Sequence, residues 1–234
     1  MGEDAGRIRL RRVSKSYKTK AGWNHVLRNV SFDINPTDRI GILGRNGAGK
    51  STLLRLIGGS ELPDSGRIER GMSVSWPVGF SGHLQPSMSG RANIKFCARI
   101  YGKDVAEVTE FVLRFSELGH YLDEPFKTYS SGMKARLGFA LSMAIEFDCL
   151  LIDEVTAVGD ASFKEKCHDA LEAISENRAF VLINHGLRVI DRLCNKVIVL
   201  GVEEEPVFST KVHKTIKAYQ QALKGEAWVR PEAA

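Results

Sequence analysis

The sequence lacks the features that mark membrane-spanning and secreted proteins. No apolar segment approaches the roughly 18–20 residues that a helix needs to cross a bilayer. The opening residues, Met1 to Asp4, are acidic, whereas a secretory signal is basic and then apolar. Gly6 stands where a myristoylation signal has Ser or Thr. We therefore expect a soluble protein that meets a membrane only through a partner.

The four cysteines are too scattered for a metal site or a disulfide framework. Cys97, Cys149, Cys167 and Cys194 form no C-x-x-C pair. Cys149 lies in an apolar run, where a thiol behaves as a small buried apolar side chain. This usage fits a reducing cytoplasm.

Charges of both signs are mixed along the chain. The 33 basic and 28 acidic residues give a net charge of +5, and the densest basic runs extend from Arg7 to Arg12 and from Lys15 to Lys20. We interpret these runs as a solvated strand face; a partner with acidic groups, such as phospholipid or nucleic acid, is the alternative. The 43% hydrophobic content suffices for one large α/β domain, or for a core with a small subdomain.

One stretch fits the phosphate-loop pattern G-x-x-x-x-G-K-[ST] at every position. It consists of Gly44, Arg45, Asn46, Gly47, Ala48, Gly49, Lys50, Ser51 and Thr52. Glycines let such a loop wrap closely around a triphosphate with its N–H groups pointing inward, and the helix that follows adds a favourable dipole. We expect Lys50 to reach the β- and γ-phosphates and Ser51 to bind Mg²⁺.

The residues on either side suit this loop. Residues 40–43 are predicted as a buried strand entering it, and residues 51–57 as a helix that Gly58 and Gly59 end. A chance glycine-rich turn is the alternative, but strand, loop and helix are all in register. The sequence therefore predicts binding of a nucleoside triphosphate.

Strands alternate with helices along the rest of the chain, which predicts an α/β fold with a mainly parallel core sheet and an antiparallel β flank. We expect strands at residues 8–13, 26–32, 67–69, 149–152, 180–183 and 197–200, and helices at 92–101, 105–118, 132–145, 163–174 and 211–223. We interpret residues 1–234 as a single nucleotide-binding domain. It would include a helical subdomain at about 86–145 and a short C-terminal helical tail at about 207–234.

Two further motifs suggest chemistry. The apolar run from Cys149 ends in two carboxylates: Asp153 is expected to hold Mg²⁺ through its waters, and Glu154 to polarise an attacking water. Residues 129–134, Tyr-Ser-Ser-Gly-Met-Lys, open a predicted helix at whose positive end Ser130 and Gly132 could bind an anion. A serine N-cap is the alternative there, and on these six residues alone we prefer it.

In this order, the motifs resemble the nucleotide-binding subunit of ATP-binding-cassette (ABC) transporters, over nearly the whole chain. Residues 44–52 match the Walker A loop, residues 150–154 the Walker B strand and residues 129–133 the signature. That signature keeps only the first Ser and the second Gly of the common Leu-Ser-Gly-Gly-Gln. The resemblance implies a P-loop NTPase fold with a helical subdomain, ATP and Mg²⁺ as ligands, and ATPase activity.

The resemblance also implies roles for single residues. Gln85 matches the Q-loop glutamine, a ligand of ATP and Mg²⁺, and His185 matches the switch histidine, which acts in catalysis with Glu154 and Lys50. Residues 158–160 match the D-loop. Tyr17 matches the aromatic residue that stacks on adenine, although Trp23 or His25 could supply that ring instead. Alone, a histidine after a strand is more often structural and a lone glutamine has no role; their joint occurrence at family spacing favours the functional roles.

Within the family, residues 129–134 and 153–163 are similar to the ATPases that export bacterial surface polysaccharides. Residues 76–80 and 89–94, Trp-Pro-Val-Gly-Phe and Ser-Gly-Arg-Ala-Asn-Ile, are most similar to the capsule branch. Exporters of O-antigen and teichoic acid often append a sizeable domain, for which too few residues follow the last expected strand. We therefore expect the polysaccharide to be handled indirectly.

The resemblance implies two partners. Two copies of the chain would sandwich two ATP molecules, with Ser130 and Gly132 of one copy on the γ-phosphate held by the other. Residues 86–127 would grip a separate membrane permease, which keeps the chain at the cytoplasmic face of the bacterial inner membrane. The alternatives are a soluble ABC ATPase acting on ribosomes or DNA, and a binding module without turnover. A single cassette without heptads disfavours the former, and thus a nucleic-acid partner; Glu154 and His185 count against the latter.

Overall fold

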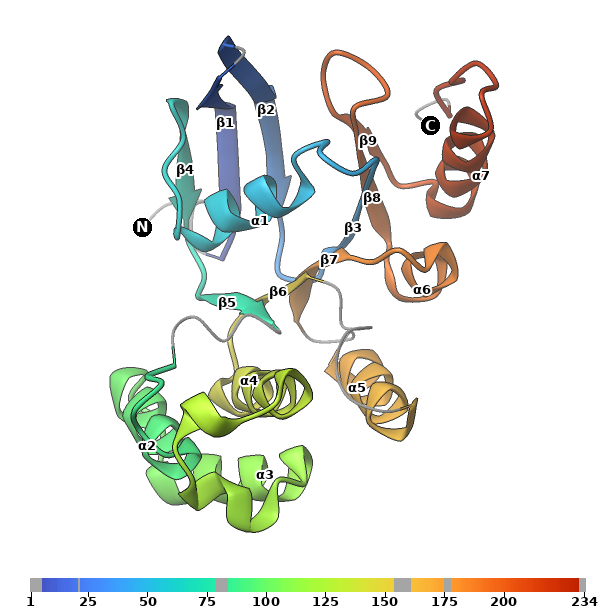
Figure 1. Cartoon of the computed structure of the whole chain (residues 1–234). Coiled ribbons are helices and arrows are strands. Elements are labelled where there is room, and N and C mark those ends of the chain that lie inside the picture. The colour runs from blue at the N-terminus through green and yellow to red at the C-terminus, as the bar shows by residue number, and fades with distance from the viewer. Residues whose placement is uncertain (1–5, 21, 79–83, 154–160, 175–177, 232–234) are drawn as a thin grey trace.

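The computed structural model (Figure 1) describes residues 6–20, 22–78, 84–153, 161–174 and 178–231, whose strands form two sheets. The smaller sheet contains, in spatial order, β2 (Gly22–Ile34), β1 (Ile8–Thr19) and β4 (Ser65–Arg70). The larger contains β5 (Val74–Val78), β6 (Cys149–Asp153), β7 (Ala179–Ile183), β3 (Arg39–Gly44), β8 (Lys196–Leu200) and β9 (Val207–Ser209).

The larger sheet is parallel except at β9. Strand β3 pairs in parallel with β7 on one side and with β8 on the other, and β6 and β5 extend the sheet beyond β7. Strand β9 returns antiparallel to β8. Strands β6, β7, β3 and β8 are buried along most of their length, which is why each reads as a continuous apolar run in the sequence. The predicted mainly parallel core sheet is confirmed.

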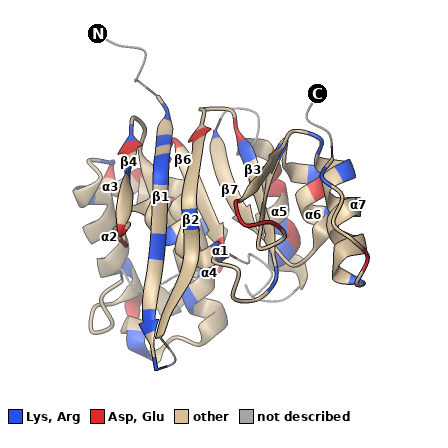
Figure 2. Cartoon of the chain, turned by 90° about the horizontal axis from the view of Figure 1, so that it is seen from above, with Lys and Arg blue, Asp and Glu red and all other residues tan. Residues whose placement is uncertain are grey.

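The smaller sheet is the antiparallel flank that the sequence predicts. Strand β1 pairs antiparallel with β2 and with β4, and it buries Ile8, Leu10 and Val13 on its inner face. Between these positions stand basic residues, which Figure 2 shows spaced along β1. Arg11, for example, is half-exposed and forms an ion pair with Asp33. This arrangement supports the interpretation of the basic run as a solvated strand face.

Three helices lie together below the larger sheet in Figure 1: α2 (Gly90–Ile100), α3 (Val105–Ser116) and α4 (Ser131–Ile145). Each begins after a residue whose side chain accepts a hydrogen bond from the first turn, namely Ser89, Asp104 and Ser130. Their apolar faces join a core cluster that includes Leu150 and Ile152 of β6. We call residues 85–145, which contain α2, α3, α4 and the segments that precede and join them, the helical part.

The remaining helices cover the two faces of the larger sheet. Helix α1 (Lys50–Gly58) packs its apolar side on Ile40 and Ile42 in one cluster, together with the inner face of the smaller sheet. Helices α5 (Ala161–Ile174), α6 (Leu187–Leu193) and α7 (Val212–Leu223) contribute to the other cluster, with Leu43. Gly59 ends α1 in a left-handed conformation, as expected. No helix in the described part of the chain combines the length and apolarity needed to span a membrane.

The sequence does not predict β5, α6 or β9. Pro77 argues against a strand, yet β5 tolerates it because β5 lies at the edge of the sheet. Helix α6 has seven residues and β9 three, too few for a hydrophobic period to be visible. The segment interpreted as a helical tail from residue 207 therefore begins with a strand, and within its described part, residues 207–231, α7 is the helix.

Phe139 of α4 provides a test of how the helical part is attached to the core. It is fully buried, stacks on Phe115 of α3 (ring centroids 5.5 Å apart) and meets Phe163 of α5 edge-on (6.5 Å). We expect Phe139→Ala to lower the free energy of unfolding by about 3–5 kcal/mol, because the truncation leaves a cavity. Leu62→Ala is the control: Leu62 is 76% exposed, and urea unfolding should show a change below about 0.5 kcal/mol. Similar losses in both variants would contradict the packing described here.

Candidate functional site

The phosphate loop begins where β3 ends, at Gly44, and closes onto the first turn of α1. Gly47 and Gly49 have φ values of 85° and 94°, in the left-handed region that glycine adopts without strain. The Ala48 N–H donates to the Arg45 carbonyl (3.1 Å), which tightens the turn. Consecutive N–H groups in such a loop converge on an anion, so its backbone fits a bound phosphate chain.

Gly49 also lies against the smaller sheet. A Cβ at this position would overlap the Val26 side chain of β2 and would lie 3.2 Å from Leu27. A Cβ at Gly47 would meet no other atom within 4 Å. Strand β2 therefore supports the loop from behind at one point, and only glycine allows that close approach.

Lys50 lies over the loop that it follows. Its Nζ donates to the carbonyls of Gly44 (2.8 Å) and Arg45 (3.1 Å). A phosphate oxygen in the loop would compete with these carbonyls for the same amine. Ser51 is half-buried next to it in the first turn of α1 and Thr52 is buried, and the positive end of the helix faces the loop.

The carboxyl ends of three adjacent strands bring further candidates to this edge of the sheet. Asp153 ends β6 and pairs in register with Ile183, which ends β7 and itself pairs with Ile42 of β3. His185 follows β7 after one intervening residue, and its side chain is exposed. Asp153, His185 and the phosphate loop thus share the edge at which open α/β sheets bind ligands. Glu154 and residues 158–160 lie outside the described residues.

Gln85 and Ser130 belong to the helical part. Gln85 precedes α2; its side chain is exposed, while its backbone N–H donates to Asn93 Oδ1 (2.8 Å). Ser130 is the N-cap of α4 and accepts from the Met133 N–H (3.2 Å), so the N-cap interpretation is confirmed, and Gly132 lies in the first turn. In Figure 1 α4 lies below the larger sheet and α1, whose first turn follows the phosphate loop, lies above it.

Tyr17, for which the resemblance predicts stacking on adenine, lies beside the first turn of α1. Its hydroxyl is 3.3 Å from Thr52 Oγ1 of α1. Directly paired residues of an antiparallel ladder share a face, and Tyr17 pairs with Asn24. The neighbours of Asn24, Trp23 and His25, therefore face the opposite side of the β1–β2 ladder. Of the three rings considered from the sequence, Tyr17 is the one directed at α1.

A charged network holds the Tyr17 hydroxyl. It donates to Glu61 Oε1 (2.6 Å) and accepts from Arg55 Nη2 (3.2 Å), while Arg55 Nε donates to Glu61 Oε2 (3.0 Å). Lys15 pairs with Glu61 (3.4 Å) and lies over the Tyr17 ring. The sequence motifs point to neither Arg55 nor Glu61, because single charged residues at a helix end are common.

The protonation of Glu61 follows from these contacts. Burial by itself would raise the pKa of this carboxyl group, but hydrogen bonds from Tyr17, Arg55 and Lys15 outweigh burial and leave the pKa below its ordinary value. A lowered folded-state pKa means that the network stabilises the fold above the unfolded-state pKa and is lost as the pH falls through the folded-state pKa. At neutral pH the network is therefore intact.

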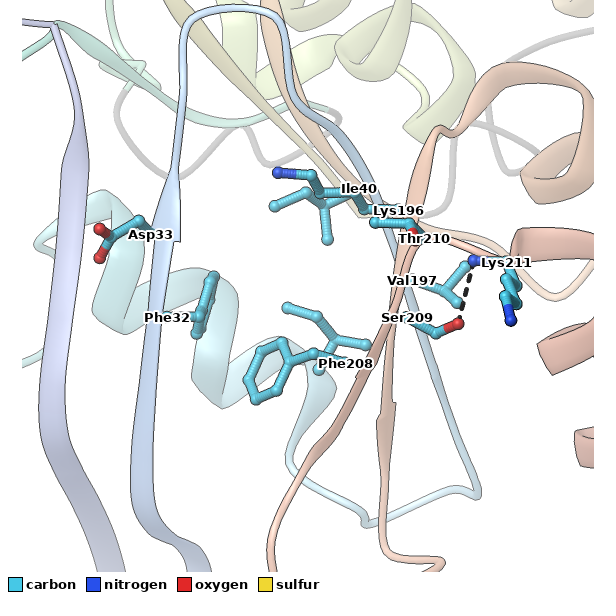
Figure 3. Close-up of a pocket in the computed structure, with 10 residues that line it drawn as sticks. Phe32, Asp33, Ile40, Lys196, Val197, Phe208, Ser209, Thr210 and Lys211 are labelled. Carbon is cyan, nitrogen blue, oxygen red and sulfur yellow. Dashed lines mark hydrogen bonds between the residues drawn. The ribbon is translucent and has the colours of Figure 1, made fainter. Parts of the chain in front are cut away.

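A cavity of about 340 Å³ lies elsewhere, between β2 and the β8–β9 hairpin (Figure 3). The rings of Phe32 and Phe208 meet at one end of it, with centroids 5.1 Å apart. Lys196 at its rim is paired with Asp38 (2.8 Å). Ile40 and Lys196 stand near the amino ends of β3 and β8, the edge opposite to the phosphate loop, so this cavity is separate from the candidate site.

Comparisons with known proteins agree with this geometry. The model of the family described as ABC transporter matches residues 27–157. The capsule polysaccharide export ATP-binding protein CtrD of Neisseria meningitidis serogroup B is 52% identical over 82% of this chain and 89% of its own length. The polysialic acid transport ATP-binding protein KpsT of Escherichia coli is 46% identical over 92% of this chain and its full length. An ATP-binding cassette solved as a post-hydrolysis dimer with ADP and Pi shares the fold, with a TM-score of 0.72 at 22% identity over 82% of this chain and 94% of that one.

The Tyr17 network gives a prediction for nucleotide affinity. We expect Tyr17→Phe and Glu61→Gln to raise the dissociation constant for ATP about five- to tenfold, because each leaves a partner in the network unpaired and frees the ring to move. Trp23→Leu should leave the constant unchanged. Titration with a fluorescent ATP analogue measures all three. If Trp23→Leu weakened ATP binding while the Tyr17 and Glu61 variants did not, Trp23 would be the residue whose ring stacks on adenine.

The support of the loop by β2 gives a second prediction. Gly47→Ala and Gly49→Ala both place a Cβ at a left-handed φ, at a cost of about 1–2 kcal/mol each, but only Gly49→Ala also overlaps Val26. We expect a larger drop in melting temperature for Gly49→Ala, and partial recovery when Val26→Ala is added. Equal drops for the two glycine variants, measured without nucleotide, would contradict the contact.

Proposed function

The chain belongs to the ABC transporter family, and we propose that it is the ATP-hydrolysing subunit of an exporter that moves a capsular or related surface polysaccharide across the bacterial inner membrane. A separate permease would form the path through the membrane. The observation that carries this proposal is the phosphate loop with Asp153 and His185 on one sheet edge, in a chain 46% and 52% identical to two polysaccharide-export ATPases.

The residues of the loop fit a nucleoside triphosphate. The left-handed glycines and the first turn of α1 supply N–H donors, Lys50 supplies a cation, and Tyr17 supplies a ring for the base. Ser51 and Asp153 offer the oxygen ligands that Mg²⁺ prefers, with Gln85 as a further ligand. When bound, Mg²⁺ would neutralise charge that develops on the phosphate oxygens.

We propose that the active unit is a symmetric dimer. A two-fold axis makes each chain contribute to both sites. One chain would supply Lys50, Ser51, Gln85, Asp153, Glu154 and His185, and the other Ser130 and Gly132. The placement of α4 and α1 on opposite faces of the larger sheet supports this arrangement. Within the site, Glu154 would accept the proton of the attacking water and His185 would contact the γ-phosphate.

The permease is proposed to dock on the helical part. Helix α2 carries Phe96 and Ile100 in exposed positions, and Tyr101 follows them. A contiguous apolar surface of this kind suits a protein partner. The polysaccharide would be handled indirectly, and the chain would sit at the cytoplasmic face of the inner membrane through the permease. The alternative, a soluble ABC ATPase acting on ribosomes or nucleic acid, is not favoured, since the relatives are named for polysaccharide export.

Glu154 is the residue on which a test of this proposal depends. We expect Glu154→Gln to bind ATP normally and to lose hydrolysis by about a hundredfold or more, because the amide cannot accept a proton from water. The measurement is the ATPase rate of the purified chain and of the variant, each alone and with the candidate permease in lipid. Turnover that vanishes in the variant and responds to the permease is the expected result.

Two outcomes would contradict the proposal in different ways. Near-normal turnover in Glu154→Gln would overturn the role of Glu154. Turnover that no membrane partner changes would revive the soluble ATPase, and copurification with ribosomes or DNA would then be the next measurement.

A further inference from the structure

A buried asparagine fixes the backbone at Gln85. Asn93 of α2 is fully buried. Its Oδ1 accepts from the Gln85 N–H (2.8 Å) and its Nδ2 donates to the Gln85 carbonyl (3.1 Å) and to the Ser89 carbonyl (3.1 Å). One side chain thus holds both backbone groups of Gln85, while the Gln85 side chain stays exposed. The position of the Q-loop glutamine is therefore set by α2.

The backbone after Gln85 pairs with the backbone before the signature. The Lys127 N–H donates to the Pro86 carbonyl (2.8 Å), and the Phe126 N–H to the Met88 carbonyl (2.8 Å). Ser89 forms a β-bridge with Pro125. Residues 85–90 and 125–130, which we call the linked segments, run side by side for this reason, although they lie far apart in the sequence.

Tyr129 lies at the end of the second linked segment and packs against the start of α2. The residue is buried, and its hydroxyl donates to the Tyr121 carbonyl (2.5 Å). Burial raises the pKa of Tyr129 to about 12, so the hydroxyl keeps its proton at neutral pH. A Cβ on Gly90, the first residue of α2, would overlap this hydroxyl. Tyr129 therefore packs directly on the start of α2 and immediately precedes Ser130.

We propose that Asn93 and Tyr129 are positioning residues that hold Gln85 and Ser130 in one rigid element. Gln85 would contact the nucleotide of its own chain, and Ser130 the nucleotide of the partner. Any displacement of Gln85 by the first nucleotide would then move Ser130 relative to the second. The inference rests on the proposed dimer. It explains why Tyr129 stands where the common signature has leucine, and why the segment 89–94 contains Gly90 and Asn93.

The rigidity follows from burial and from the number of connections. Each half of the element is held by a buried polar side chain whose partners are backbone groups, and such bonds are costly to break because the freed groups cannot reach water. The exposed ion pair of Arg91 with Asp123 (2.7 Å) adds a further link between the same regions, of little strength in water. A movement that separated the linked segments would have to break the backbone hydrogen bonds between them and lift Tyr129 off Gly90. A movement of both segments as one body breaks none of these contacts.

The first experiment compares two tyrosines of the same region. Tyr129→Phe removes the buried hydroxyl, and Tyr121→Phe removes an exposed one whose loss leaves the linked segments unchanged. We expect Tyr129→Phe and Asn93→Ala to lower kcat about five- to tenfold, because a loosened element positions Ser130 less often. Tyr129→Phe should leave the ATP affinity of the isolated chain unchanged. Tyr121→Phe should keep the kcat of the unaltered protein. All rates are measured well below the melting temperature and per folded molecule.

A double variant separates positioning from stability. Gly90→Ala alone should lower both melting temperature and kcat, because its Cβ overlaps the Tyr129 hydroxyl. Adding Tyr129→Phe removes the overlapped atom, so the double variant should recover part of both. If the double variant loses less melting temperature and less kcat than the sum of the two single-variant losses, the contact is supported. Losses equal to that sum would overturn it.

A distance measurement tests the rigid element without hydrolysis. The four native cysteines are buried, so spin labels can be placed on Ser87→Cys, in one linked segment, and on Ser131→Cys, directly after the other; both positions are exposed. We expect one narrow distance distribution with and without a slowly hydrolysed ATP analogue, and a broadened one in Asn93→Ala and Tyr129→Phe. An equally narrow distribution in these variants would overturn the inference. An unaltered chain that neither hydrolyses ATP nor dimerises would instead overturn the proposed function and leave this distance result standing.

Discussion

The register of the parallel sheet is the constraint on which the site depends. Asp153, Ile183 and Ile42 stand side by side on β6, β7 and β3, so the residues that follow each strand emerge at one edge and at similar heights. A slip of one residue in any of these strands would turn every side chain of that strand to the other face. The two core clusters prevent such a slip, because Ile42 faces one and Leu43 the other. The alternation of side chains between the two core clusters therefore fixes both the packing of the sheet and the positions of the candidate site residues at its edge.

Helix α1 connects the phosphate loop to the smaller sheet. Its first turn follows the phosphate loop, and its last carbonyls, at Leu56 and Ile57, accept from the Arg70 guanidinium of β4. Arg55 of the same helix binds the Tyr17 hydroxyl. The smaller sheet therefore contacts α1 through Tyr17 and Arg70, and this short helix would set the position of the proposed adenine platform relative to the phosphates.

What the sequence predicts well is local. The phosphate loop can be read from Gly47, Gly49 and Lys50 because left-handed glycines and a helix start leave a fixed spacing. The core strands can be read because parallel strands buried on both faces are apolar throughout. By contrast, the Glu61 partner of Tyr17 is 44 residues away in the sequence, and no local pattern marks a contact of that kind. The role of Asn93 likewise could not be predicted from the sequence. It follows from the structure, in which Asn93 is buried and accepts a hydrogen bond from the Gln85 N–H.

The division into two bodies gives the linked segments their importance. The phosphate loop and Asp153 belong to the α/β core, whereas Gln85 and Ser130 belong to the helical part. A nucleotide can bias the position of the helical part only by as much as it binds one arrangement better than another. If Gln85 moved independently of Ser130, nucleotide binding would shift Gln85 locally at the start of α2. Ser130 would not move, and the second site would be unaffected. Buried hydrogen bonds at Asn93 and Tyr129 make local relaxation the costlier response. Under the proposed coupling, the favoured response would be a movement of the whole helical part, which also carries the exposed apolar residues Phe96 and Ile100 of α2.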